Sequence, residues 1–188
     1  MTTNTKRAIM DLAESLLQDK GFNGFSYAHI SSELGVKNAA IHYHFPTKEA
    51  LVCAVVQRYR DRFQLWINNA RVKDLSPQDK LDWFFSIYAN MRADHGKVCL
   101  AGSLETEFNS LPDALRQQTE ALTGELLAWL GATLAEGREA GVFQFNGDPA
   151  DKAALILSSL QGVLQMARAL GAEKFHAVVE QHKRDMLV

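Results

Sequence analysis

The chain has 188 residues, of which 47% are hydrophobic and 22% are charged, and its formal net charge is −2. This composition is typical of one or two small globular domains and excludes a disordered chain. No stretch resembles a secretory leader and no run reaches the ~18 apolar residues of a membrane span, so we expect a cytoplasmic protein with no membrane partner.

A first amphipathic helix is predicted from about Thr5 to Lys20, where apolar side chains recur at the i, i+3, i+4, i+7 spacing. Gly21 stands where a left-handed cap would end this helix. Ser26 is a favourable N-cap for a second helix that reaches Leu34.

The segment from Gly35 to Leu51 is the most informative part of the chain. Gly35 can supply the positive φ of a tight interhelical turn, and a third helix is expected to begin near Lys37 and to stop at Pro46. Thr47 is a good N-cap for a fourth helix. Two short helices joined by such a turn indicate a helix-turn-helix unit, whose second helix enters the major groove of DNA.

This segment resembles the TetR family of bacterial transcriptional regulators, and the resemblance covers residues 6 to 56. The family pattern also includes an Ala-rich first helix and a Gly-aromatic pair before the second helix. The positions that match it are Gly35, Val36, Ala40, His44, Phe45, Lys48, Glu49, Ala50 and Leu51, with conservative changes at Ile41 and Thr47. The positions that depart from it are Lys37, Asn38, Ala39, His42 and Tyr43, which leaves the operator sequence open.

The resemblance implies that ten residues contact DNA. Six are expected to hold phosphates and set the register, and they are Ser26, Tyr27, Tyr43, His44, Thr47 and Lys48. Four lie nearer to base edges, and they are Lys37, Asn38, Ala39 and His42. The alternative is that these residues merely form the surface of a small helical domain.

A metal or cofactor is not expected. His42 and His44 are two positions apart, so on a helix they lie on different faces and do not share one ion as an i, i+4 pair does.

The charge is unevenly distributed along the chain. Residues 1 to 62 carry eight basic and six acidic side chains, whereas the remainder carries twelve basic and sixteen acidic ones. We call the slightly basic N-terminal part the head and the acidic remainder the body. This distribution suits a DNA-binding protein whose affinity depends on well-placed contacts more than on bulk charge.

The rest of the chain is predicted to be all-α. A fourth helix is expected to carry an apolar stripe from Val52 to Ala70, and Ser76-Pro77 is expected to start another helix. Further helices are predicted over about 98–109, over 113–140, from Asp148-Pro149 to Gly171, and from there to about 186. We therefore expect a helix-turn-helix DNA-binding domain at 1–46 and a helical ligand-binding and dimerisation domain at 47–188.

In the helices predicted at 113–140 and 150–170, apolar side chains cover a wider part of the helix surface than packing against one core requires. In the family the corresponding helices form a four-helix dimer interface, so the resemblance implies a homodimer on a near-palindromic DNA operator. The alternative is a monomer that buries both helices. The candidate interface residues are Leu122, Leu126, Trp129, Leu157, Leu160 and Leu164.

Large side chains in the body are candidates for lining the site of an unknown small-molecule effector. Most such residues simply form cores, and a ligand site also needs a few convergent polar groups. The candidates are Phe63, Trp66, Trp83, Phe84, Ile87, Met91, Cys99, Ser103, Glu107, Phe108, Trp129 and Gln161.

The segment from His95 to Leu100 resembles the Gly-x-x-Cys-Leu entry of a TetR subgroup that includes the N-ethylmaleimide reductase repressor, in which this cysteine senses electrophiles. His95 and Lys97 would favour a Cys99 thiolate. The alternative is that Cys99 is a small buried hydrophobe. The other cysteine, Cys53, is expected to be inert.

We therefore expect a ligand-responsive transcriptional regulator, most simply a repressor, and not an enzyme. The sequence lacks a nucleophile with an adjacent base, a metal cluster and a Gly-rich phosphate loop. A small helical enzyme or carrier is the alternative from another class, and an activator without its own effector is a third possibility.

Overall fold

The computed structural model describes residues 2–93, 96–171 and 173–186, and over these ranges its regular elements are all helices, as predicted. The chain forms two compact units. The first comprises residues 1–64 and 100–122, and the second comprises residues 65–99 and 123–188.

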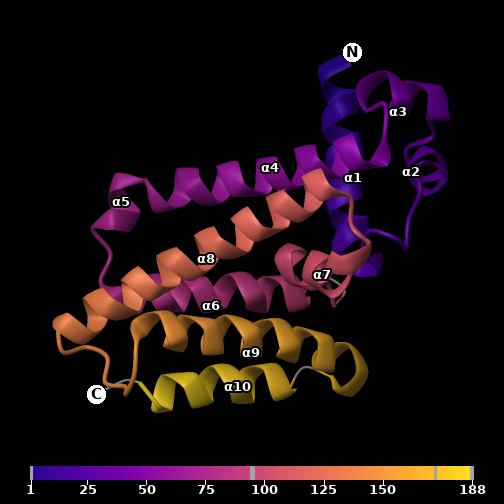
Figure 1. The fold of residues 1–188 in the computed structure, drawn as a ribbon. Coiled ribbons are helices and arrows are strands. Elements are labelled where there is room, and N and C mark those ends of the chain that lie inside the picture. Colours follow the sequence, from indigo (N-terminus) through magenta and orange to yellow (C-terminus); the bar gives the residue numbers. More distant parts are fainter. Residues whose placement is uncertain (1, 94–95, 172, 187–188) are drawn as a thin grey trace. The chain divides into compact units, whose positions relative to one another are not determined.

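The three predicted N-terminal helices are present in the first unit. They are α1 (Thr2–Lys20), α2 (Tyr27–Leu34) and α3 (Asn38–His44). Helix α7 (Leu100–Thr106), although distant in sequence, packs against α1 in the same unit (Figure 1).

Two glycines shape this head as predicted. Gly21 has φ 75° and its amide donates to the Leu17 carbonyl at 3.0 Å, which closes α1. Gly35 has φ 64°, and a Cβ built there would meet no atom within 4 Å. The backbone conformation, rather than lack of space, therefore requires a glycine at position 35.

Helix α4 (Lys48–Ile67) is shorter than predicted. Its apolar stripe was expected to continue to Ala70. The chain breaks at Asn69, whose extended backbone and side-chain oxygen begin a separate short helix α5 (Ala70–Lys73). The Asn69 Oδ1 accepts from the Arg71 amide at 2.9 Å. An Asn side chain that satisfies a free amide competes with helix continuation, and this explains the error.

Two further helix starts follow the predicted capping residues. Helix α6 (Pro77–Ala93) begins after Ser76, whose Oγ accepts from the Asp79 amide at 3.1 Å. Asp148 caps the start of α9 (Pro149–Leu170) and accepts from the Ala150 amide at 2.8 Å. The other elements are η1 (Phe108–Ser110), α8 (Asp113–Glu139) and α10 (Glu173–Arg184).

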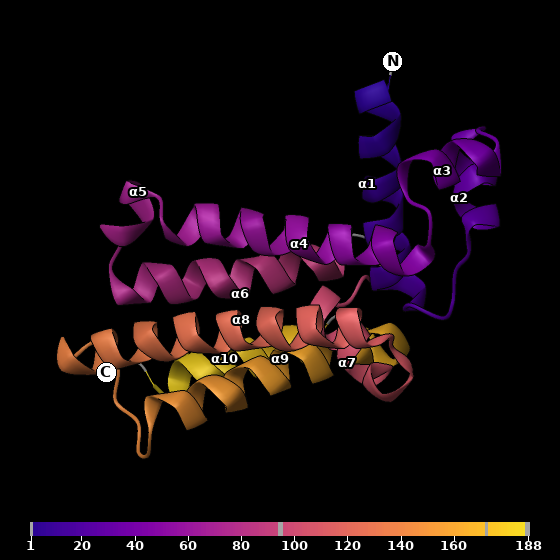
Figure 2. The ribbon, with the colours of Figure 1, turned by 45° about the horizontal axis from the view of Figure 1, so that its top comes forward.

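Each unit has its own apolar core. In the first unit Ile9, Leu17, Ile30 and Ile41 are fully buried, so α1, α2 and α3 share one interior. In the second unit α9 packs against both α6 and α10, and Figures 1 and 2 both show α9 and α10 side by side. Burial of each large apolar side chain contributes roughly 1.5–3 kcal/mol to folding.

Helix α9 is also the one element in the described ranges that is long and apolar enough to cross a membrane, with a mean hydropathy of 1.3 in its best window. A search for uninterrupted apolar runs does not identify this helix, because serines and glutamines interrupt its apolar residues. A third of that window is buried inside the protein, and core helices of soluble proteins meet the same criterion.

Candidate nucleic-acid interface and effector site

Helix α3 is anchored from one side and exposed on the other. Ile41 is fully buried and Phe45 nearly so. The candidates on the opposite side, Lys37, Asn38, Ala39, His42 and Tyr43, are all exposed, and Tyr43 is 78% exposed. An exposed row of this kind on a short, anchored helix can present hydrogen-bond donors and aromatic rings to a groove of DNA.

The turn between α2 and α3 is held by backbone hydrogen bonds from Gly35 and Val36 to the Ser31 carbonyl. At the other end of α2 the Ser26 amide donates to Nδ1 of His29 at 3.0 Å. His29 was missed by the sequence reading. Its position three residues after an N-cap serine is the signal that identifies it.

Tyr27 lies inside the head rather than on its surface. Its hydroxyl donates to the Phe45 carbonyl at 2.9 Å, and burial raises the pKa of Tyr27 to about 12. Its ring packs edge-on against the His42 ring, with 4.8 Å between centroids. The Tyr27 hydroxyl therefore already has a buried hydrogen-bond partner, and its contact with a phosphate stays a prediction.

Lys48 is also turned inward. Its ammonium donates to the Phe25 carbonyl at 2.5 Å and to the Phe22 carbonyl, and it lies 4.5 Å and 4.4 Å from the centres of the Phe22 and Phe25 rings. Burial lowers the pKa of Lys48, and the charge of Glu107 opposes that change. Lys48 therefore ties the start of α4 to the α1–α2 turn, and its phosphate contact stays a prediction.

Thr47 has the predicted capping role, since its Oγ1 accepts from the Ala50 amide at 3.1 Å. Ser26 and Thr47 are exposed and His44 is half-buried. His42 Nδ1 lies 3.2 Å from the Pro46 carbonyl, which holds its ring at the end of α3.

Two polar effector candidates form hydrogen bonds within the first unit. Ser103 on α7 donates to the Leu17 carbonyl at 2.6 Å. The Glu107 carboxylate accepts from the Asn23 amide at 2.9 Å and from its side chain at 3.3 Å. Both partners lie more than 80 residues earlier in the sequence, so no local pattern could reveal these contacts.

In the second unit the aromatic effector candidates do come together. Trp66 and Trp83 are stacked, and Trp129 stands edge-on to both at 5.3 Å and 6.4 Å. Phe84 lies 5.6 Å from Trp129 and is fully buried, whereas the three tryptophans are half-buried. We call these four residues the aromatic cluster.

The other effector candidates differ in their surroundings. Ile87 and Met91 on α6 are half-buried, as is Phe108 in the first unit, and Phe63 is buried there. Gln161 on α9 has a buried side-chain nitrogen with no hydrogen-bond partner in the described part of the chain. Such a donor is free for a ligand atom.

Cys99 is buried, and its sulfur lies 3.6 Å from the Tyr88 hydroxyl. The predicted helper His95 lies outside the described residues. Sensing by Cys99 therefore stays a prediction, and it requires an opening that exposes the sulfur. Burial and the charge of Glu49 raise the pKa of the Cys53 thiol, in keeping with an inert cysteine.

The candidate dimer residues need a correction. Leu122, Leu126, Leu157, Leu160 and Leu164 are all buried within the single chain, and this leaves their side chains little area to offer a partner. These side chains of α8 and α9 therefore face the core of their own chain. On α9 the exposed large apolar residues are instead Leu155, Met166 and Leu170.

Comparison with known proteins agrees with this geometry. Residues 9–55 match the family described as bacterial regulatory proteins, tetR family, and residues 77–182 match the tetracyclin repressor-like C-terminal domain. A crystal structure of a TetR-family regulator from Agrobacterium tumefaciens is 29% identical, with a TM-score of 0.92 and 100% of both chains covered.

Two further relatives are regulators by name. An HTH-type transcriptional regulator from the lacX 3′ region of Lactococcus lactis is 27% identical over 173 residues, which is 88% of this chain and 84% of that protein. The HTH-type transcriptional repressor NemR of Escherichia coli K12 is 22% identical over 168 residues, again 88% of this chain and 84% of that protein. These relatives are regulators and not enzymes. The chain therefore belongs to the TetR family and is a ligand-responsive, DNA-binding transcriptional regulator.

Proposed function

We propose that this regulator is a repressor that binds a near-palindromic operator as a homodimer and is released by a small-molecule effector. Residues 1–46 would read DNA, and residues 47–188 would dimerise and bind the effector. Like other regulators of transcription in bacteria, it would act in the cytoplasm. The observation that carries the proposal is the exposed face of α3, fixed from behind by buried Ile41 and Phe45.

On that face, base reading would be the task of Lys37, Asn38, Ala39 and His42. An Asn amide pairs with adenine in a bidentate manner, and Lys donates to guanine acceptors. Exposed Tyr43, with His44, Ser26 and Thr47, would hold phosphates and set the register. The inward roles of Tyr27 and Lys48 would keep α2, α3 and the start of α4 in a fixed arrangement.

Dimerisation would use the exposed face of α9. Leu155, Met166 and Leu170 are 55%, 48% and 68% exposed, which is unusual for three large apolar residues on one helix. Gly162 lies between them, and a Cβ built there would meet nothing within 4 Å. A second copy of the same helix could therefore approach closely, and a two-fold contact is the common form of such an interface.

The effector would contact the aromatic cluster, with the unsatisfied Gln161 nitrogen as a polar contact from α9. An effector that binds the conformation with lower DNA affinity would shift the population away from the operator, without any chemical step. The helices α4 and α8 each continue from one compact unit into the other, so both are candidates for transmitting that shift.

Fluorescence anisotropy with duplexes from the DNA flanking the gene tests the repressor proposal. We expect Asn38→Ala and His42→Ala each to lose about 1–3 kcal/mol of binding free energy on the best duplex. Lys20→Ala, which removes an exposed charge at the far end of α1, is the matched control and should change little. Wild-type affinity in both α3 variants, or no binding to any flanking duplex at low salt, would overturn the proposal.

A further inference from the structure

A cleft between α1 and α4 in the first unit is not used by any role described above. Its volume is about 420 Å³, and it is lined by Lys6, Arg7, Met10 and Asp11 from α1 and by Arg58 and Arg62 from α4. This volume lies within the range of small-molecule sites in proteins.

The cleft carries an excess of positive charge. Four of its six lining side chains are cationic, and Asp11 is its one carboxylate. Glu14, which pairs with Arg58 and Arg62 at 2.7 Å and 2.5 Å, adds a second carboxylate beside it. Two positive charges therefore remain unbalanced within one concave site, which concentrates the positive potential there.

Two carboxylates fix Arg58 in the cleft. Its Nη1 donates to Asp11 at 2.6 Å and its Nη2 donates to Glu14 at 2.7 Å. Its Nε is buried and has no hydrogen-bond partner in the ranges that the structure describes. A guanidinium held in this manner loses little further side-chain entropy when a ligand binds.

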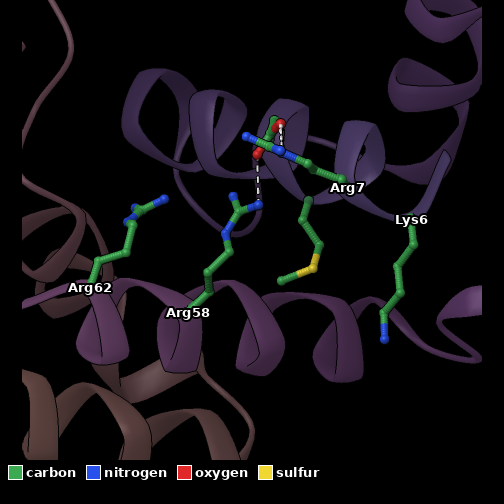
Figure 3. A pocket seen from close by; sticks show the side chains of 6 residues that line it. Lys6, Arg7, Arg58 and Arg62 are labelled. Atoms are coloured by element: carbon green, nitrogen blue, oxygen red, sulfur yellow. Dashed lines mark hydrogen bonds and ion pairs between the residues drawn. The ribbon is translucent and has the colours of Figure 1, made fainter. Parts of the chain in front are cut away.

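The other three cations are less constrained. Arg62 is half-exposed and uses one nitrogen for Glu14, while Arg7 has only a long 3.8 Å contact with Asp11 between two exposed side chains. Lys6 has no ion pair among residues 2–93, 96–171 and 173–186, and its ammonium lies 5.6 Å from the Phe45 ring. Figure 3 shows Lys6 reaching from α1 toward α4, and Arg58 and Arg62 reaching from α4 toward α1.

Met10 gives the cleft an apolar part. Its flexible thioether side chain adapts to irregular ligand surfaces and packs well against aromatic rings. A site that combines such a surface with several cations discriminates in favour of a ligand that has both a negative group and an apolar body.

We propose that the α1–α4 cleft is a binding site for a small organic anion, a carboxylate or phosphate ester with an apolar body. The negative group lies beside Arg7 and Arg62, with Arg58 as a prearranged neighbour, and the apolar body lies on Met10. Lys6 adds positive charge at the other end of the cleft (Figure 3). This site is separate from the aromatic cluster and does not depend on DNA binding.

Methionine-methyl NMR tests the proposal directly, because the chain has five methionines and one of them lines the cleft. The probe is naphthalene-1-carboxylate, and naphthalene-1-carboxamide is its neutral counterpart. We expect the carboxylate to shift the Met10 methyl signal, assigned with Met10→Leu, and the carboxamide to leave it in place at equal concentration.

The charge requirement is tested with variants of the full chain. Lys6→Gln combined with Arg62→Gln should weaken binding of the carboxylate at least about tenfold. Lys20→Gln removes an exposed charge from α1 outside the cleft and should stay within about twofold of wild type. If the double variant unfolds, Arg7→Gln provides the test, because its side chain is 81% exposed and should weaken binding without loss of fold.

Three outcomes would overturn the proposal. The first is a Met10 signal that does not move with the carboxylate, and the second is an equal response to the carboxamide. The third is a double variant that loses DNA affinity with a shallower salt dependence but leaves the carboxylate titration unchanged, because these cations would then hold operator phosphates.

Discussion

Tyr27 and Lys48 stabilise the DNA-binding head through the polar ends of their side chains. Tyr27 joins the start of α2 to the carbonyl that follows α3, and Lys48 joins the start of α4 to the α1–α2 turn. Both residues stand at positions where the family resemblance implied DNA contact. At this scale, the proposed reading of DNA by α3 would depend on rigid support behind its exposed face as much as on the face itself.

Local interactions at single residues could be predicted, and long-range ones could not. Gly21, Gly35, Thr47 and Asp148 act within four residues of themselves, so their roles follow from cap and turn preferences. The Phe25 carbonyl that holds Lys48 is 23 residues away, and no local pattern reports such a contact.

Gly35→Ala tests the turn at the residue scale. We expect a loss of about 1–2 kcal/mol in the free energy of unfolding, because a Cβ is strained at φ 64°. Gly35→Asn should lose less, since Asn tolerates the left-handed region. Urea titration followed by circular dichroism measures both, with exposed Ser32→Ala in α2 as the control. Equal stability of Gly35→Ala and wild type would contradict the account.

Among the elements, α9 has apolar side chains on two faces, one buried and one exposed. Its buried face holds Leu157, Leu160 and Leu164 against the core of the second unit, and its exposed face is free for a partner. The apolar stripe of a helix can be read from sequence, but a helix with apolar residues on several sides does not reveal which side its own chain covers. This is why the sequence pattern alone placed buried Leu157, Leu160 and Leu164 among the candidate contact residues.

The α9–α10 contact contains a buried histidine and predicts a pH dependence. His182 Nε2 lies 2.5 Å from the Ser159 hydroxyl, and burial, followed by the charge of Lys152, lowers the pKa of His182 below its ordinary 6.5. The unfolded chain therefore binds this proton more readily than the folded chain does. Stability contributed by neutral His182 should be present above about pH 6.5 and should decrease as the pH falls below it.

Thermal unfolding between pH 7.5 and 5.5 measures this effect. We expect the melting temperature of wild type to fall more steeply over this range than that of His182→Gln. His176→Gln, an exposed neighbour on the same helix, should follow wild type. Parallel profiles for wild type and His182→Gln would rule out a role for His182.

The aromatic cluster allows an optical test of effector binding. The three tryptophans of the chain all belong to it, so their emission reports on one place. We expect an apolar effector that contacts the cluster to change most of the tryptophan emission and to do so less strongly in Gln161→Leu. A ligand that releases the protein from DNA without any change in emission would place the effector elsewhere.

For the whole molecule, the proposed repressor function requires two DNA-binding heads that act together. A single short recognition helix makes few base contacts, and residues 1 to 62 carry only a small basic excess. Two linked heads gain affinity because the second binding event is intramolecular. The family and the all-α architecture could be predicted from the Gly35–Leu51 motif and the helix starts, whereas the effector could not, since it depends on packing between distant segments.

The most direct test of this claim is an anisotropy titration that compares the full near-palindromic operator with a duplex that contains one half-site. We expect two chains per operator, binding of the half-site at least a hundredfold weaker, and loss of that advantage in Leu155→Glu/Met166→Glu. One chain per duplex, with equal affinity for the operator and the half-site, would contradict the account.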